Sequence, residues 1–106
     1  MINGCLKNIP KHKRKKVIFS RNYLYNLYKK KGILKCHYCN NNNLLVQLNH
    51  FNKIESEKMA TIDHILPISK GGAIYDIGNI VVSCSKCNSE RGNMDYLEFK
   101  KLKENN

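Results

Sequence analysis

The sequence predicts one small α+β domain, in which a helix precedes two strands and two shorter helices follow them. The length of 106 residues leaves room for a single domain. Apolar residues recur at helical spacing over about 21–31 and 94–103, and β-branched runs predict strands over 60–66 and 79–83. Because the core of so short a chain is modest, we also expect a further stabilising element.

Local signals justify each element in turn. Ser20 can cap the first helix, and Gly32 follows a run of lysines that suits its C-terminal end. Residues 44–51 can form a strand or a short helix. Pro67 bounds the first strand, a loop with several glycines separates it from the second strand, and a short helix is expected over 85–91.

Positive charge is concentrated in the first third of the chain. The net charge is +11, and residues 1–35 hold eleven of the nineteen Lys and Arg residues but no Asp or Glu. Such a block is typical of a protein that binds a polyanion, although a solvated tail or a targeting segment has the same composition. We expect residues 1–16 to be a flexible basic arm and residues 17–106 to form the folded domain. The arm residues expected to bind nucleic acid are Lys11, Lys13, Arg14, Lys15 and Lys16.

Hydropathy argues against a membrane or secreted location. The chain has no run of about 18 apolar residues, so we expect neither a membrane-spanning segment nor a membrane partner. It has no apolar segment near Met1, so we expect no secretory signal. We therefore expect an intracellular, reducing location, either cytoplasmic or associated with the nucleoid.

Four of the five cysteines form two Cys-x-x-Cys pairs, Cys36/Cys39 and Cys84/Cys87. The two thiolates of each pair are close enough in sequence to bind the same ion. Four thiolates are a common ligand set for one structural Zn²⁺. One pair alone can be a redox motif or chance, but two pairs in a chain without a secretory signal predict a four-cysteine zinc site. Such a site can contribute on the order of 10 kcal/mol to folding. The fifth cysteine, Cys5, is expected to be a free thiol.

Further motifs follow the first cysteine pair in a defined order. They are Thr61-Ile62-Asp63-His64-Ile65-Leu66-Pro67, Gly71-Gly72, Gly78-Asn79-Ile80-Val81 and Cys84-Ser85-Lys86-Cys87-Asn88. In order and spacing they resemble the HNH endonuclease family, in its zinc-bearing subgroup of the ββα-metal (His-Me finger) nucleases. The resemblance runs from Cys36 to about Asn93, and it is specific because it depends on the combination. It implies that residues 17–106 are an HNH nuclease domain, with a ββα-metal core held together by the zinc site and flanked by helices.

The resemblance implies a role for four residues. Hydrolysis of a phosphodiester needs an activated water and stabilisation of the leaving oxygen. His64 would be the general base, because a neutral histidine can take a proton near pH 7. Asp63 and Asn88 would bind a catalytic Mg²⁺ or Mn²⁺, which prefer oxygen ligands. Asn79 would hold a loop and orient the histidine. The third residue of the HNH motif is often His. Asn88 occupies this position and departs from the motif, but its side chain still supplies an oxygen ligand.

Each of these residues has an ordinary alternative when it is taken alone. His64 can be a half-buried histidine with satisfied hydrogen bonds, and Asp63 a solvated or capping carboxylate. Asn79 can be a turn residue, and Asn88 can cap a helix. Strand neighbours also point to opposite faces, so Asp63 and His64 can share a site only if the strand ends or bends there.

Together these features predict a metal-dependent DNA endonuclease that nicks or cuts double strands. Arg91 and Lys86 are expected to bind phosphate near the site, or else to be solvated surface charges. The chief alternative is a zinc-containing nucleic-acid-binding module without catalysis, and a zinc-held adaptor protein is a second. Because no separate recognition domain is evident, high sequence specificity would require a partner protein or a second copy.

Overall fold

The computed structural model describes residues 9–47 and 53–105; Cys5 lies outside these ranges. Helices and strands follow the predicted order, which confirms the α+β class. Within the described ranges, no helix is long and apolar enough to cross a membrane. The elements are α1 (Lys11–Lys31), β1 (Ala60–His64), β2 (Ile80–Cys84), α2 (Ser85–Arg91) and α3 (Tyr96–Glu104), with short 3-10 helices η1 (Ile68–Lys70) and η2 (Ile77–Asn79) between the strands.

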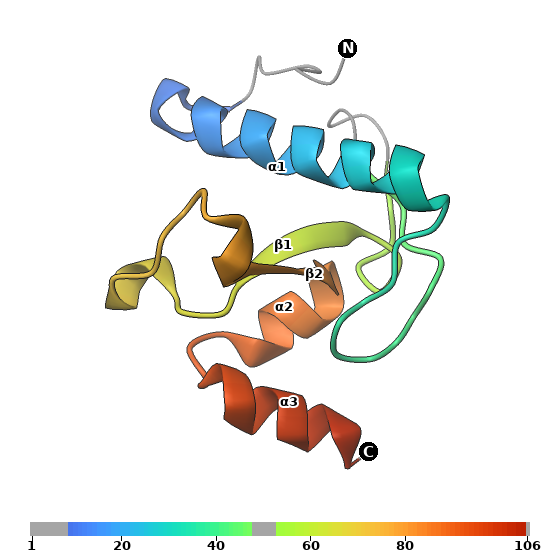
Figure 1. Cartoon of the computed structure of the whole chain (residues 1–106), viewed down its shortest axis with the longest axis vertical. Helices are drawn as coiled ribbons and strands as arrows, with labels where there is room; N and C mark the ends of the chain where they lie inside the picture. The colour runs from blue at the N-terminus through green and yellow to red at the C-terminus, as the bar shows by residue number, and fades with distance from the viewer. Residues whose placement is uncertain (1–8, 48–52, 106) are drawn as a thin grey trace.

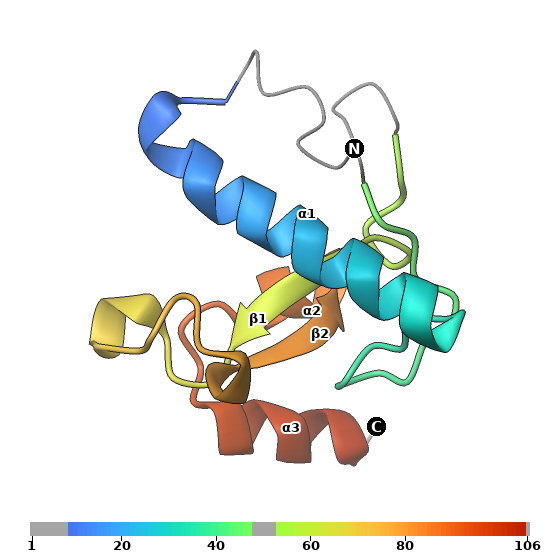
Figure 2. The same ribbon diagram turned by 45° about the horizontal axis from the view of Figure 1, so that its top comes forward.

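The two strands form an antiparallel sheet with α1 on one side and α2 and α3 on the other (Figure 1). Ala60 pairs with Cys84 at one end, and His64 pairs with Ile80 at the other end. In the turned view, α1 crosses over β1 (Figure 2). Helix α1 contacts β1, and α2 contacts both strands. The sheet and α2 therefore form the predicted ββα core.

Helix α1 begins at Lys11, ten residues before its predicted start at residue 21. The expectation of a flexible arm up to residue 16 is therefore wrong for residues 11–16, and α1 crosses the predicted boundary of the domain. Lys and Arg are good helix formers, and no Gly or Pro interrupts the segment after Pro10, so the helix extends over the basic cluster. Ser20 lies inside the helix and does not cap it. The end agrees with the prediction, since Gly32 adopts the left-handed conformation with φ of 79°.

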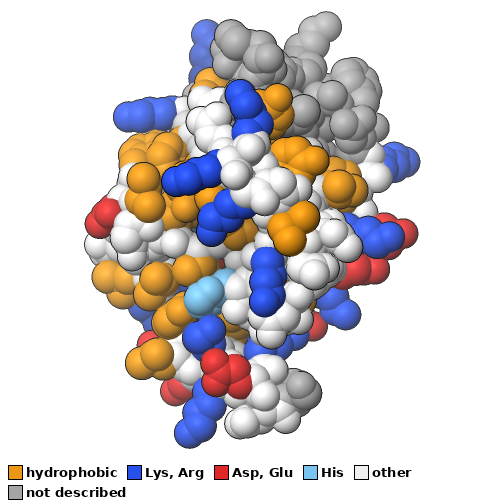
Figure 3. Space-filling view, turned by 45° about the vertical axis from the view of Figure 1, so that its right-hand side comes forward, with side chains coloured by type: hydrophobic (Ala, Val, Ile, Leu, Met, Phe, Trp, Pro, Cys, Tyr) orange, Lys and Arg blue, Asp and Glu red, His pale blue; other side chains and the backbone are white. Residues whose placement is uncertain are grey.

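The basic residues of α1 contribute to a mixed surface. Lys and Arg side chains alternate with hydrophobic side chains over the upper half of the face in Figure 3, the half that contains α1. Lys11 and Lys15 are exposed, whereas Arg14 is half-buried and its Nε donates to the carbonyl of Ile9 at 3.0 Å. A polyanion that approaches α1 therefore meets positive charge next to apolar surface.

One buried cluster joins the helices to the cysteine pairs. Leu24 of α1 and Phe99 of α3 belong to it. Cys36, Cys84 and Cys87 are buried in the same cluster. Three of the four paired cysteines are therefore part of the core, whereas Cys39 is exposed, and a metal ion bound by the four would connect the segments that form it.

Smaller differences from the predicted boundaries occur at three places. Strand β1 ends at His64, two residues earlier than expected. Helix α3 begins at Tyr96, because the carboxylate of Asp95 caps it by accepting from two backbone N–H groups. Leu45 forms an isolated bridge with Met59, and the rest of the ambiguous 44–51 segment lies partly outside the described residues.

Candidate active site

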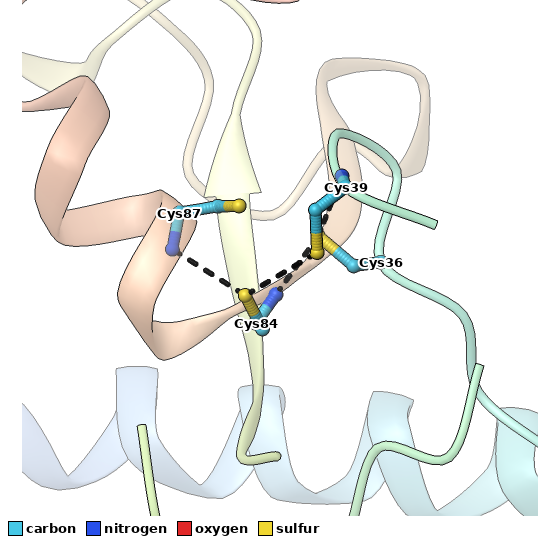
Figure 4. A group of neighbouring side chains, drawn as sticks. All are labelled: Cys36, Cys39, Cys84 and Cys87. Carbon is cyan, nitrogen blue, oxygen red and sulfur yellow. Dashed lines mark hydrogen bonds between the residues drawn. The ribbon is translucent and has the colours of Figure 1, made fainter. Parts of the chain in front are cut away.

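Two chain segments bring the four paired cysteines together (Figure 4). Cys36 and Cys39 lie on the loop after α1, while Cys84 ends β2 and Cys87 lies in α2. Their Sγ atoms all lie within 4.8 Å of one another, and those of Cys39 and Cys84 are 3.9 Å apart. A tetrahedral zinc–thiolate site with bonds of about 2.3 Å needs sulfur separations of about 3.8 Å. The cysteines are therefore placed to hold a metal ion such as zinc.

Backbone N–H groups point at the sulfur atoms of this cluster. Cys39 and Cys84 donate to Sγ of Cys36 at 3.5 and 3.3 Å, and Cys87 donates to Sγ of Cys84 at 3.4 Å. Burial raises the pKa of Cys36, but hydrogen bonds from Cys39, Cys84 and Tyr38 outweigh it and lower the pKa to about 7. Burial raises the pKa of Cys84 and of Cys87, and the neighbouring cysteines raise both further by charge repulsion. Four thiolates this close repel one another, so the cluster suits a cation.

His64 ends β1 and lies half-buried beside a cavity of about 230 Å³. We call this cavity the catalytic pocket because residues predicted to be catalytic line it. The Nε2 atom of His64 lies 3.0 Å from the carbonyl oxygen of Ile74. Because a carbonyl only accepts hydrogen bonds, Nε2 carries the hydrogen and Nδ1 keeps its lone pair. Nδ1 is therefore the nitrogen that can accept a proton.

The catalytic pocket brings together three of the four residues predicted to be catalytic. Asp63, His64 and Asn88 all line it, and Lys16 of α1 lines it as well. Strand neighbours Asp63 and His64 reach the same pocket because β1 ends at His64. Asn79 is not among the residues that line the pocket.

Asp63 is 8% exposed, and two donors hold one of its carboxylate oxygens. Arg91 Nη1 donates to Oδ2 at 2.7 Å, and the hydroxyl of Tyr38 donates to the same atom. Burial raises the pKa of Tyr38, and the hydrogen bond and charge of Asp63 raise it further, so Tyr38 keeps its proton. Because both donors occupy Oδ2, Oδ1 is the oxygen left for a cation in the pocket.

The side chain of Arg91 is buried and forms hydrogen bonds within the protein, which the sequence did not predict. Arg91 is 3% exposed, and its guanidinium donates to the carbonyls of His64, Ile65 and Met94 at 2.7, 2.9 and 2.9 Å. Burial lowers the pKa of Arg91, but the hydrogen bond and charge of Asp63 raise it overall. These hydrogen bonds join the end of α2 to the end of β1. Arg91 also lines the catalytic pocket, so the predicted phosphate contact stays a prediction.

Asn88 follows Cys87 directly and lies within α2. Its Nδ2 donates to Thr61 Oγ1 at 3.1 Å and to the carbonyl of Ile62 at 3.3 Å. These bonds hold the amide against β1 and leave the amide oxygen on the opposite side of the group. The alternative that Asn88 caps the helix does not apply, because Cys84 occupies the N-cap position.

Asn79 lies in η2 and its side chain closes the loop between the strands. It accepts from the N–H of Leu66 at 2.8 Å and donates to the carbonyls of Leu66 and Ala73, both at 3.0 Å. Ala73 immediately precedes Ile74, whose carbonyl holds Nε2 of His64. Asn79 is therefore connected to the histidine through the loop and not through the catalytic pocket.

The lysines predicted to bind nucleic acid are separated on the surface. Lys13 and Lys16 line cavities between α1 and β1, whereas Lys86 is exposed on α2. Two residues not singled out from the sequence also belong to this region. Tyr38 donates a hydrogen bond to Asp63. Its position in the sequence between two predicted metal ligands is the feature that could have indicated a role near the site. Arg21 lines a cavity beside Lys16, and only its place in the acid-free segment pointed to it.

A sequence model described as HNH endonuclease matches residues 36–94. The matched segment contains both cysteine pairs, both strands, α2 and eight of the ten residues that line the catalytic pocket. It covers more than half of the 106 residues. No curated protein matches the chain.

Proposed function

Because the chain belongs to the HNH endonuclease family, we propose that it is a metal-dependent endonuclease that hydrolyses phosphodiester bonds in DNA. The observation that carries the proposal is the convergence of Asp63, His64 and Asn88 on one pocket. A general base and two oxygen ligands for a metal ion are the groups that metal-dependent phosphodiester hydrolysis requires. A module that only binds nucleic acid has no need of this combination.

His64 is the general base of the proposed reaction. The carbonyl of Ile74 accepts from Nε2 and so keeps Nδ1 free to take a proton from water. The water oxygen then forms a bond to phosphorus as the bond from phosphorus to the 3′ oxygen breaks. The leaving oxygen takes a proton from solvent, which gives a 5′-phosphate and a 3′-hydroxyl.

Asp63 and Asn88 are the residues that would hold the catalytic ion through their Oδ1 atoms. One carboxylate and one amide oxygen suit Mg²⁺ or Mn²⁺, which keep several other oxygen ligands. When bound, such an ion supplies positive charge that stabilises the leaving oxygen and orients the phosphate. Tyr38 and Arg91 position the carboxylate for this role by holding its other oxygen.

The four cysteines would hold a separate, structural Zn²⁺. Their sulfur separations fit a tetrahedral ion, and all four ligands come from the protein, as in structural zinc sites. Cys87 and Asn88 are consecutive in α2, so the ion would hold the helix that presents the second oxygen ligand. Zinc would therefore support catalysis by shaping the site.

Nucleic-acid binding would depend mainly on positive charge. The net charge of +11 and the lysines of α1 favour attraction to phosphates without regard to sequence. Such binding weakens steeply as the salt concentration rises. Recognition of a particular DNA site would then need a partner protein or a second copy of the chain.

Plasmid cleavage tests the proposal. Supercoiled plasmid should be nicked or linearised with Mg²⁺ or Mn²⁺, and omission of both ions should stop the reaction. His64→Ala should lose cleavage but keep DNA binding, and His12→Ala is the control because it removes an exposed histidine from α1. Because EDTA also competes for zinc, inhibition by EDTA counts only where added Mg²⁺ restores activity. A folded protein that binds DNA but never nicks it with any divalent ion would favour the non-catalytic binding module.

A further inference from the structure

A second cavity lies between α1 and β1, next to the catalytic pocket. Its volume is about 480 Å³, within the range of sites that bind small organic groups. Apolar residues such as Val17 and Leu24 line part of it, and three cations, Lys13, Lys16 and Arg21, line it together with uncharged polar residues. We call it the helix cavity. Among the described residues that line it there is no Asp or Glu, so its charge is not neutralised from within.

Arg21 gives the helix cavity an unsatisfied donor. Its Nη1 atom is buried and has no hydrogen-bond partner among the described residues. A buried donor without an acceptor costs about 1–3 kcal/mol, and more when it is charged. Nη1 therefore lacks an acceptor among the described residues, and an anion that binds in the helix cavity would supply one after a small movement of the side chain. A phosphate suits it well, because its oxygens match the fork of guanidinium N–H groups.

The helix cavity adjoins the catalytic pocket. Lys16, Ser20 and Ile62 line both. Lys13, Lys16 and Ser20 lie three or four residues apart on α1, and Arg21 lies four residues after Val17, which lines the same cavity. These side chains therefore share the broad face of α1 that crosses β1 (Figure 2). A strand with one phosphate in the catalytic pocket therefore has a basic path for its next phosphate along α1.

We propose that the helix cavity binds the backbone phosphate adjacent to the one that is cut, with Arg21 as its principal ligand. Lys13 and Lys16 add charge, and the apolar lining packs against the sugar. This inference deepens the proposed function and rests on it in one respect, because the ligand is taken to be the nucleic-acid substrate. It makes α1 the element that sets the path of the strand across the site.

DNA binding by the Arg21→Gln variant tests the inference. The variant is made in a His64→Ala background, and its binding to a short fluorescent DNA duplex is measured by anisotropy over a range of salt concentrations. The affinity should fall about tenfold, the size expected for a charged hydrogen bond. The salt dependence should lose about one unit of slope, as expected for one phosphate contact. Lys30→Gln removes an exposed charge from the same helix outside the cavity and should change binding much less.

Two further measurements separate a binding role from a structural one. The Arg21→Gln variant should melt at the same temperature as its parent or higher, because it removes an unsatisfied buried donor. Arg21→Lys keeps the positive charge but loses the planar set of guanidinium N–H donors. Its affinity for DNA should therefore lie between those of the parent and of Arg21→Gln. Unchanged affinity in Arg21→Gln, or a loss of affinity that accompanies a lower melting temperature, would overturn the inference.

The outcome is distinguishable from failure of the proposed function. A protein that binds DNA through Arg21 but never cuts it would refute the proposed catalysis and leave the helix cavity supported. A parent protein that does not bind DNA at all would refute both. In an active enzyme, Arg21→Gln should raise KM more than it lowers kcat, because Arg21 does not line the catalytic pocket.

Discussion

Arg91 donates to Asp63 at 2.7 Å, and both side chains are buried. The ion pair joins the last residue of α2 to the residue before His64. Attraction within a buried pair offsets the cost of removing both charges from water but contributes little beyond that. The pair therefore serves mainly to position Asp63, and loss of either partner leaves a buried charge.

Replacement of Arg91 by Met should lower the free energy of unfolding by about 3–5 kcal/mol, because Asp63 would remain buried without its partner. Urea denaturation of the metal-loaded protein measures the change. Lys101→Met removes an exposed charge from α3 and should change stability by less than about 0.5 kcal/mol. If Arg91→Met and Lys101→Met were equally stable, Asp63 would not depend on Arg91 for its buried position.

Asn79→Ala should lower kcat for DNA cleavage by about tenfold to a hundredfold, because small displacements of a catalytic group have effects of this size. The substitution removes three hydrogen bonds that hold the loop whose Ile74 carbonyl binds His64. Asn79→Asp keeps the acceptor for Leu66 N–H but places a carboxylate oxygen against the carbonyls of Leu66 and Ala73, so its kcat should fall at least as far as that of Asn79→Ala. Steady-state kinetics with a short duplex measure kcat and KM, and KM should change little. An Asn79→Ala enzyme with normal kcat would contradict the connection.

Removal of the structural ion should abolish cleavage by unfolding the domain. Cys84 is buried in the core cluster, and structural zinc contributes on the order of 10 kcal/mol, comparable with the stability of a whole small domain. Cys84→Ser should lose helical circular dichroism and its cooperative thermal transition. Cys5→Ser, which changes the one cysteine outside both pairs, is the control. A Cys84→Ser protein that stays folded and cuts normally would refute this dependence.

Affinity for zinc should fall as the pH falls from about 8 to about 6, because protons compete with the metal for thiolates. The pKa of Cys36 is about 7, so this ligand begins to take up a proton in that range. The pKa values of Cys84 and Cys87 are raised, so binding must displace their protons even at neutral pH. Competition with a chromophoric chelator at several pH values measures the trend. An affinity independent of pH would be inconsistent with a four-thiolate site.

The sequence predicted the order of elements and the cysteine cluster because both depend on local patterns. Gly32 ends α1 as expected, and two short spacings place one cysteine pair on the turn after α1 and the other at the junction of β2 and α2. The start of α1 could not be predicted in the same way. A run of basic residues is compatible with either a tail or a helix, and packing of α1 against β1 favours the helix here.

Side-chain partners across the core were beyond sequence reasoning. Arg91 is 28 residues from Asp63, and nothing local distinguishes a buried arginine from one that binds phosphate. Tyr38 and Asp63 meet only because the loop after α1 lies against the sheet. Local spacing indicated which residues belong to the region, whereas tertiary packing decides which atoms are free to react.

The separation of the two cysteine pairs has a consequence for synthesis of the chain. Cys84 follows Cys39 by 45 residues, which corresponds to roughly 2–9 seconds of translation at about 5–20 residues per second. During that interval the first pair has left the peptidyl-transferase centre and the second has not yet been made. A nascent chain that binds zinc at this site would therefore complete its coordination late, after the residues of β1 have already been joined.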